Sequence, residues 1–115
     1  MSIILNRTNI NPGTALTVIF AAPNDVEIRT ITFSNTYSGL NTVSLIAYSS
    51  TSTVNSYLIS GLSIPINTTY IYTDPIFMKT SDTLSTIISY SGVHLWISYI
   101  DCGTNYSLSS TGRIF

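Results

Sequence analysis

Charge is scarce in this sequence. Four basic and five acidic residues make up 8% of a 115-residue chain, against about 25% in an average globular protein. A protein that binds nucleic acid needs a clustered basic face, but Arg7, Arg29, Lys79 and Arg113 are scattered along the chain, whose net charge is −1. We therefore predict that nucleic acid is not a partner.

Residue types that carry chemistry are also few, with one histidine and one cysteine. A serine nucleophile needs a strained turn and an oxyanion hole, and no G-x-S-x-G sequence occurs. His94 has no second histidine, and the five carboxylates lack a chelating spacing such as D-x-D-x-D. With Cys102 as its single cysteine, the chain cannot form an internal disulfide. We predict no enzymatic activity, no metal and no cofactor.

Long apolar runs are absent. No stretch approaches the roughly 20 apolar residues of a membrane span, and the first residues lack the basic and apolar regions of a secretory signal. We therefore expect no membrane association.

Residues that favour helices are rare, with no Gln, one Glu and one Lys. Short alternating runs of β-branched and aromatic residues are separated instead by Pro, Gly, Asn, Asp and Ser, which is typical of an all-β protein. We predict an antiparallel β-sandwich or jelly-roll of about eight strands, forming a single domain over residues 1–102. The expected strands are 2–8, 15–20, 26–35, 42–48, 54–60, 67–73, 76–78, 84–90 and 93–99.

Alternation within these strands predicts which side chains face the core, because successive side chains of a strand point to opposite faces. The inward sets are Leu16, Val18 and Phe20; then Val43, Leu45 and Ala47; and finally Val93, Leu95, Ile97 and Tyr99. His94, Trp96 and Ser98 then point outward.

The third expected strand changes face part-way, from Val26 and Ile28 to Ile31 and Phe33. A strand that exchanges its buried face carries a bulge or passes between sheets. We expect this change near Arg29.

The two ends of the chain differ from the middle. Residues 103–115 lack alternation, and we expect them to form an extended tail. They finish with Ile114 and Phe115, for which a lone domain has no evident use. This segment is either a frayed terminus or an arm that docks onto a neighbouring subunit. Residues 1–13 are a second possible arm.

His94 and Trp96 are the best candidates for a binding surface, with Tyr70 and Tyr72 as possible neighbours. An exposed aromatic side chain on a sheet can anchor a subunit contact or stack on a sugar ring. The remaining alternatives are that the face assignment is inverted or that a second sheet covers these side chains.

The order of short motifs along residues 15–101 is informative. The succession is RTITFSN at 29–35, VSL at 43–45, SIPINTT at 63–69, DPIFM at 74–78 and SDTL at 81–84. It resembles small virion proteins of tailed bacteriophages, particularly those that infect marine and cyanobacterial hosts. Such proteins commonly have Gly where this chain has Ser81. The motifs mostly encode turns and alternation, because Pro suits strand starts and Asn and Asp suit turns.

The resemblance implies a structural role in a virion assembled in the host cytoplasm. The first hypothesis is a capsid decoration or cement protein that binds the major capsid protein and forms homo-oligomers, either trimers or dimers. A low charge suits such a subunit, because little electrostatic repulsion keeps copies apart. The alternative is a tail- or fibre-associated recognition module that binds host-surface glycan through Trp96.

Overall fold

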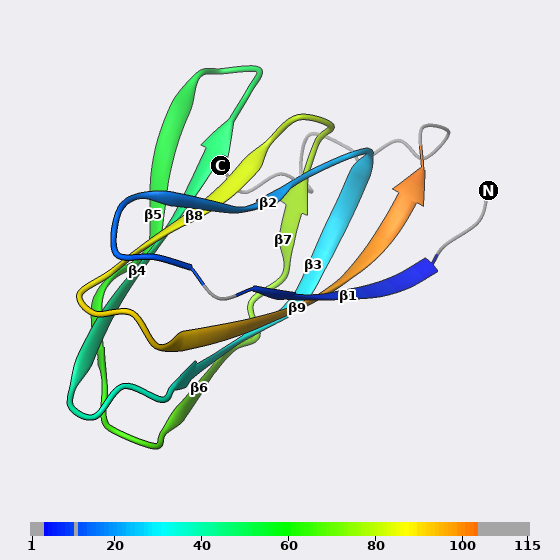
Figure 1. Ribbon diagram of the computed structural model, residues 1–115. Coiled ribbons are helices and arrows are strands. Elements are labelled where there is room, and N and C mark those ends of the chain that lie inside the picture. Colours follow the sequence, from blue (N-terminus) through cyan, green and yellow to red (C-terminus); the bar gives the residue numbers. More distant parts are fainter. Residues whose placement is uncertain (1–3, 11, 104–115) are drawn as a thin grey trace.

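A computed structural model describes residues 4–10 and 12–103. This part of the chain is all-β and contains no helix, and therefore none that could span a membrane. The fold class predicted from the sequence is confirmed. The strands, shown in Figure 1, are β1 (Ile4–Ile10), β2 (Thr17–Ala21), β3 (Asp25–Asn35), β4 (Asn41–Ser49), β5 (Val54–Ile64), β6 (Thr69–Tyr72), β7 (Ile76–Met78), β8 (Thr83–Ile88) and β9 (Val93–Gly103).

The strands form two antiparallel sheets. Sheet A has the order β1-β9-β3-β6, with β7 also paired to β3, and sheet B has the order β2-β8-β4-β5. The pairs β1·β9, β2·β8, β3·β6/β7 and β4·β5 are nested along the chain, so the polypeptide is one long hairpin rolled into two layers. Because β6 and β7 pair with successive parts of β3, they count as one interrupted strand, and the result is an eight-stranded jelly roll.

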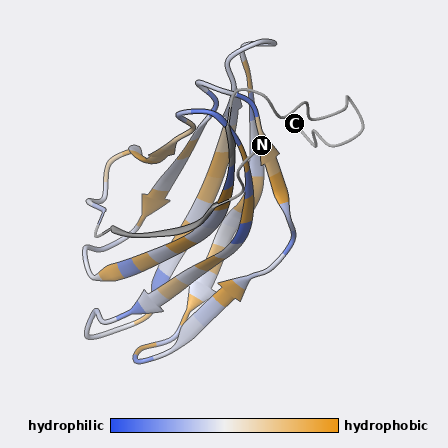
Figure 2. Cartoon of the chain, turned by 90° about the vertical axis from the view of Figure 1, so that its right-hand side faces the viewer, coloured by the Kyte–Doolittle hydropathy of each residue, from blue (hydrophilic) through white to orange (hydrophobic). Residues whose placement is uncertain are grey.

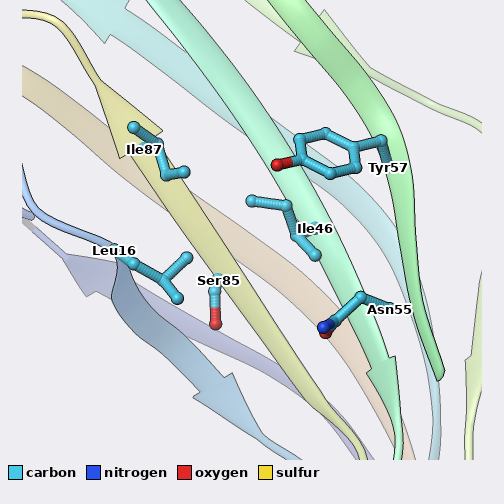
Figure 3. A pocket seen from close by; sticks show the side chains of 6 residues that line it. All are labelled: Leu16, Ile46, Asn55, Tyr57, Ser85 and Ile87. Carbon is cyan, nitrogen blue, oxygen red and sulfur yellow. The ribbon is translucent and has the colours of Figure 1, made fainter.

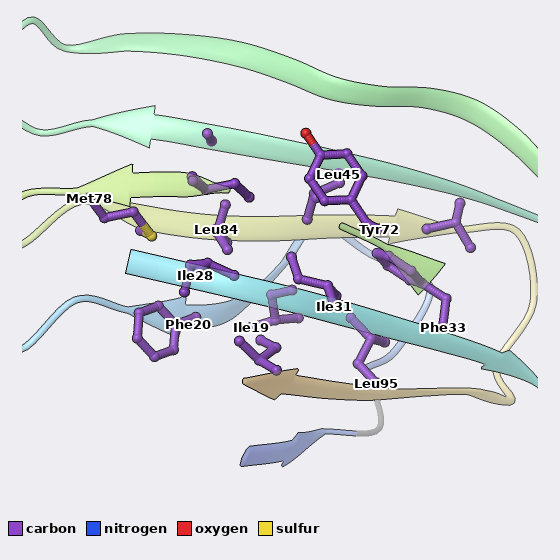
Figure 4. Close-up of a cluster of buried hydrophobic side chains, with 14 of the residues drawn as sticks. Ile19, Phe20, Ile28, Ile31, Phe33, Leu45, Tyr72, Met78, Leu84 and Leu95 are labelled. Carbon is purple, nitrogen blue, oxygen red and sulfur yellow. The ribbon is translucent and has the colours of Figure 1, made fainter. Parts of the chain in front are cut away.

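The core lies between the sheets and is filled by alternate side chains from both (Figure 4). The predicted inward residues of β4 and of β9 up to Ile97 are at most 1% exposed, and Tyr99 packs against them while partly buried. Apolar and polar residues alternate along the strands in Figure 2, as a sandwich with two outer faces requires.

A bulge in β3 explains its change of face. The register of β3 against β9 shifts between Ile28 and Thr30, which confirms the position predicted near Arg29. The extra residue brings all four apolar positions of the strand, on both sides of the bulge, to the core at no more than 1% exposure. Arg29 itself is exposed, and its Nε lies 2.7 Å from an Oε2 of Glu27.

A second bulge, in β2, overturns one prediction. Leu16 and Val18 were expected to face the core beside Phe20, but they are 64% and 57% exposed. The register of β2 against β8 shifts between Val18 and Phe20. Ile19 and Phe20 are therefore both buried, at 4% and 9% exposure, and the residues before the bulge point outward.

Several strand boundaries differ from those expected. β5 continues four residues beyond 60, passing through Gly61 at a φ of 64°, and β9 continues to Gly103. The possible arm over 1–13 includes β1, which pairs with β9 of its own chain at the edge of sheet A. The tail expected over 103–115 lies, beyond Gly103, outside the described residues.

Buried amide side chains hold the loops at one end of the sandwich. Asn35 is 1% exposed, and its Nδ2 donates to the carbonyls of Gly39 and Ile64 at 2.9 Å and of Pro65 at 3.2 Å. Its Oδ1 accepts a hydrogen bond from the backbone N–H of Tyr37 at 3.0 Å. One side chain thus joins the loop between β3 and β4 to the end of β5.

Asp82 also links two loops, at the opposite end of the sandwich. It is fully buried, and its Oδ1 accepts hydrogen bonds from the backbone N–H and the hydroxyl of Ser50 at 2.9 and 3.0 Å. Its Oδ2 accepts one from the backbone N–H of Lys79 at 2.9 Å. Asp82 thus holds the loop after β4 against the loop before β8.

Candidate interaction surfaces

The outer face of sheet A carries the predicted outward residues of β9. Trp96 is 41% exposed, while His94 and Ser98 are half-buried. In the antiparallel register Trp96 lies opposite Thr32 of β3, which lies opposite Ile71 of β6. The prediction that these β9 side chains point away from the core is confirmed. No second sheet covers them within the part of the chain that the structure describes.

Tyr70 and Tyr72 do not belong to this face. They lie opposite Phe33 and Ile31, two core residues, so their side chains point inward. Tyr72 is only 9% exposed, and its burial, with further contributions from Asp74 and Tyr70, raises the pKa of its hydroxyl. The prediction of Tyr72 as an exposed neighbour of Trp96 is wrong.

Tyr70 is more exposed than Tyr72. Its ring centroid is 6.3 Å from that of Phe33, and the side chain is 37% exposed. It therefore closes the rim of the core and is not part of the Trp96 surface. The remaining candidates, Ile114 and Phe115, lie outside the described residues, and their role stays a prediction.

The outer face of sheet B has a hollow that was not predicted from the sequence. Its volume is about 130 Å³. Figure 3 shows the side chains around it, contributed by the segment before β2 and by β8, β4 and β5. They are Leu16, Ile46, Asn55, Tyr57, Ser85 and Ile87.

The hollow has the features of a contact surface and not those of a catalytic or ligand-binding site. Pockets for small ligands usually measure about 300–1,000 Å³, so this one is too small for such a ligand. No carboxylate, imidazole or amine lines it. Among the residues that the structure describes, no group of three His, Cys, Asp or Glu side chains could hold a metal ion. The two outer faces are therefore candidates for binding surfaces.

Comparison with known proteins adds information about the fold. No known protein family matches the sequence, and no curated protein is significantly similar to it. The structure is similar to that of a Bacillus endospore appendage from a family of disulfide-linked pili, with a TM-score of 0.54 and 14% identity, covering 94% of this chain and 90% of that one.

Two viral structures are more distantly similar. The Gx strain of infectious bursal disease virus gives a TM-score of 0.43 at 10% identity, covering 91% of this chain and 34% of the viral chain. The Gt strain gives 0.41 at 13% identity, with 92% and 32% covered. This chain thus spans about a third of either viral chain.

Proposed function

We propose that this protein is a structural subunit of a virion, specifically a decoration or cement protein that binds the major capsid protein of a tailed bacteriophage. The observation that carries the proposal is that large apolar side chains are exposed on both outer faces of a domain with very little charge. Trp96 and Ile71 represent sheet A, and Leu16, Val18 and Tyr57 represent sheet B. A subunit packed against neighbours on both faces can use such surfaces.

Two further features support this role. The motifs of residues 15–101 resemble small phage virion proteins, and the Bacillus appendage with a similar fold belongs to pili, which are structural assemblies. The subunit would act through the amount of surface that it buries in contacts. Symmetric copies would bury apolar and hydroxyl-rich surface against one another and against the capsid, so that many weak contacts stiffen the shell.

The C-terminal segment is proposed as an arm that reaches a neighbouring subunit. Deleting residues 107–115, which removes Ile114 and Phe115, should weaken binding to particles while leaving the sandwich folded. Particle occupancy is measured by mass spectrometry, and folding by circular dichroism. Wild-type occupancy by the truncated protein would remove the arm from the proposal.

The deciding experiment is the copy number per particle, measured by quantitative mass spectrometry of gradient-purified virions against the major capsid protein. We expect on the order of hundreds of copies in a simple ratio to the capsid subunit. A dozen or fewer would place the protein at a neck, tail or unique vertex, where symmetry allows only small rings. Absence from the particle would contradict the virion role.

The exposure of Trp96 favours a second candidate, a tail- or fibre-associated module that binds host-surface glycan. An indole at 41% exposure among Thr and Ser side chains offers a face on which a sugar ring can stack. Trp96→Ala should then reduce host adsorption and abolish glycan-array signals, whereas Ile71→Ala on the same face should not. Unchanged adsorption by Trp96→Ala would exclude this candidate.

A further inference from the structure

Sheet B lacks charge altogether. Its strands β2, β8, β4 and β5 contain no Asp, Glu, Lys, Arg or His. In the described part of the chain, every such residue belongs to a strand of sheet A or to a connecting loop. Two strands of sheet B, β2 and β5, are edges. Charged side chains are one of the devices by which edge strands resist pairing with other molecules, and neither of these two strands carries one.

The outer face of sheet B also presents a mainly apolar strip, interrupted at one position by Ser85. Val18 lies opposite Ser85, Ser85 opposite Ile46, and Ile46 opposite Tyr57, so one row crosses all four strands. Around the nearly buried Ile46, the side chains of Leu16, Val18, Tyr57 and Ile87 are 64%, 57%, 60% and 39% exposed. Contiguous apolar surface of this kind marks an interaction site.

The size of this face suits a protein interface. Four strands about 4.8 Å apart, with a central strand about 30 Å long, give a plane on the order of 500 Å² before side-chain relief is counted. A standard interface buries about 800 Å² per partner. The whole outer face of sheet B, and not the hollow alone, is therefore needed for a stable contact.

We propose that two copies of this chain associate face to face through the outer face of sheet B. The partner surface must itself lack charge, because a charged group placed against this strip would lose its hydration without gaining a counter-ion. A second sheet B meets that requirement, and a two-fold axis brings the same patch of both copies together.

The contact resembles the packing of two sheets within a sandwich, about 10 Å apart. Side chains of one copy would then fill the hollow of the other. This contact would serve the proposed virion subunit, but it rests on the surface of sheet B and is tested without particles.

Sedimentation velocity of the purified protein tests the proposal. Between about 1 and 100 µM, a range suited to an interface of micromolar affinity, the wild type should convert from monomer to dimer. Ile87→Lys places a charge at the centre of the face and should raise the dimer dissociation constant at least about tenfold. Ile71→Lys, a matched change at a 54% exposed isoleucine of sheet A, should dimerise as the wild type does.

Circular dichroism and thermal unfolding establish that each variant is folded. If Ile87→Lys does not fold, Val18→Lys replaces it, because Val18 is 57% exposed on an edge strand. A chain ending at Gly103 should still dimerise. Loss of the dimer in that truncated chain would mean that the dimer contact depends on residues 104–115, and it would overturn the proposal.

Two other outcomes would also overturn it: a wild type that remains monomeric at about 100 µM, or a dimer that both sheet B variants leave intact. Either result is separable from the proposed function, because a monomeric protein that is still abundant in virions would keep its structural role and lose only this contact.

Discussion

Phe20 and Tyr99 meet edge to face between the two sheets, with ring centroids 4.7 Å apart and planes inclined by 63°. Phe20 belongs to β2 of sheet B, and Tyr99 belongs to β9 of sheet A. Aromatic pairs in this arrangement add about 0.5–1.5 kcal/mol beyond the area they bury. The pair therefore joins the layers at the margin of the core.

Replacing Phe20 by Ala should lower the free energy of unfolding by about 3 kcal/mol, because the change leaves a cavity beside Tyr99 and removes the ring contact. Urea denaturation of dilute protein measures this difference. The control is Val18→Ala, two residues earlier in the same strand, where 57% exposure predicts a change within about 0.5 kcal/mol. Equal losses in both variants would contradict the bulge that separates the two faces of β2.

Asn35 should be difficult to replace, because its amide satisfies backbone groups both in the loop between β3 and β4 and at the end of β5. Asn35→Ala leaves buried carbonyls and the N–H of Tyr37 without partners, and we expect a loss of about 3 kcal/mol in the free energy of unfolding. Asn55→Ala, at an exposed position, should change the free energy by less than about 0.5 kcal/mol. Urea denaturation compares the two. A small effect at Asn35 would mean that water replaces the amide.

Tyr72 should make stability depend on pH in alkaline solution. Burial first, then Asp74 and Tyr70, raise the pKa of its hydroxyl above the ordinary value of 10.0. The folded protein therefore retains a proton that the unfolded chain loses, and the contribution of Tyr72 to stability falls as the pH rises above 10. Below that pH the contribution is fully present.

Tyr72→Phe should reduce the loss of stability above about pH 10, because the variant has no hydroxyl to ionise at this position. Urea denaturation at each pH measures the slope. Phe33→Leu, a core change without a titrating group, should lower the free energy of unfolding while leaving the pH slope of the wild type. Identical slopes for wild type and Tyr72→Phe would show that the ring leaves the core before it ionises.

Alternation correctly predicted the buried face of β4 and β9, although each strand also carries a large apolar residue, Ile46 or Trp96, on its outer face. In β3 the shift from Ile28 to Ile31 revealed the bulge directly. In β2 and just before it, Leu16, Val18, Ile19 and Phe20 are all apolar, so the alternation alone did not determine which of them face the core. Only the pairing with β8 determines which of these side chains are buried, and the alternation rule predicted the wrong ones.

The candidate surfaces were predicted less completely, because exposure depends on which layer covers a strand. Trp96 could be placed outward from alternation within β9 alone. Tyr70 and Tyr72 could not, since β6 is a short edge strand with apolar residues on both faces. The strip on sheet B combines residues from β2, β8, β4 and β5, which only the jelly-roll topology brings together.

Thr86 offers a way to stabilise the fold. It is fully buried opposite Leu45, and among the described residues its Oγ1 is the one buried side-chain nitrogen or oxygen atom without a hydrogen-bond partner. Thr86→Val replaces that hydroxyl with a methyl group of similar size. Since an unsatisfied buried hydroxyl costs about 1–3 kcal/mol, the variant should gain about 1 kcal/mol, or about 4 °C in Tm for a domain of this size.

Thr86→Ser provides the matched comparison, because it keeps the hydroxyl and removes the methyl group that packs in the core. It should lose about 1 kcal/mol. Thermal and urea unfolding of the three proteins give the order Val above Thr above Ser. If Val is less stable than Thr, the hydroxyl has a bound water as its partner, and the interior of sheet B beside Leu45 is hydrated.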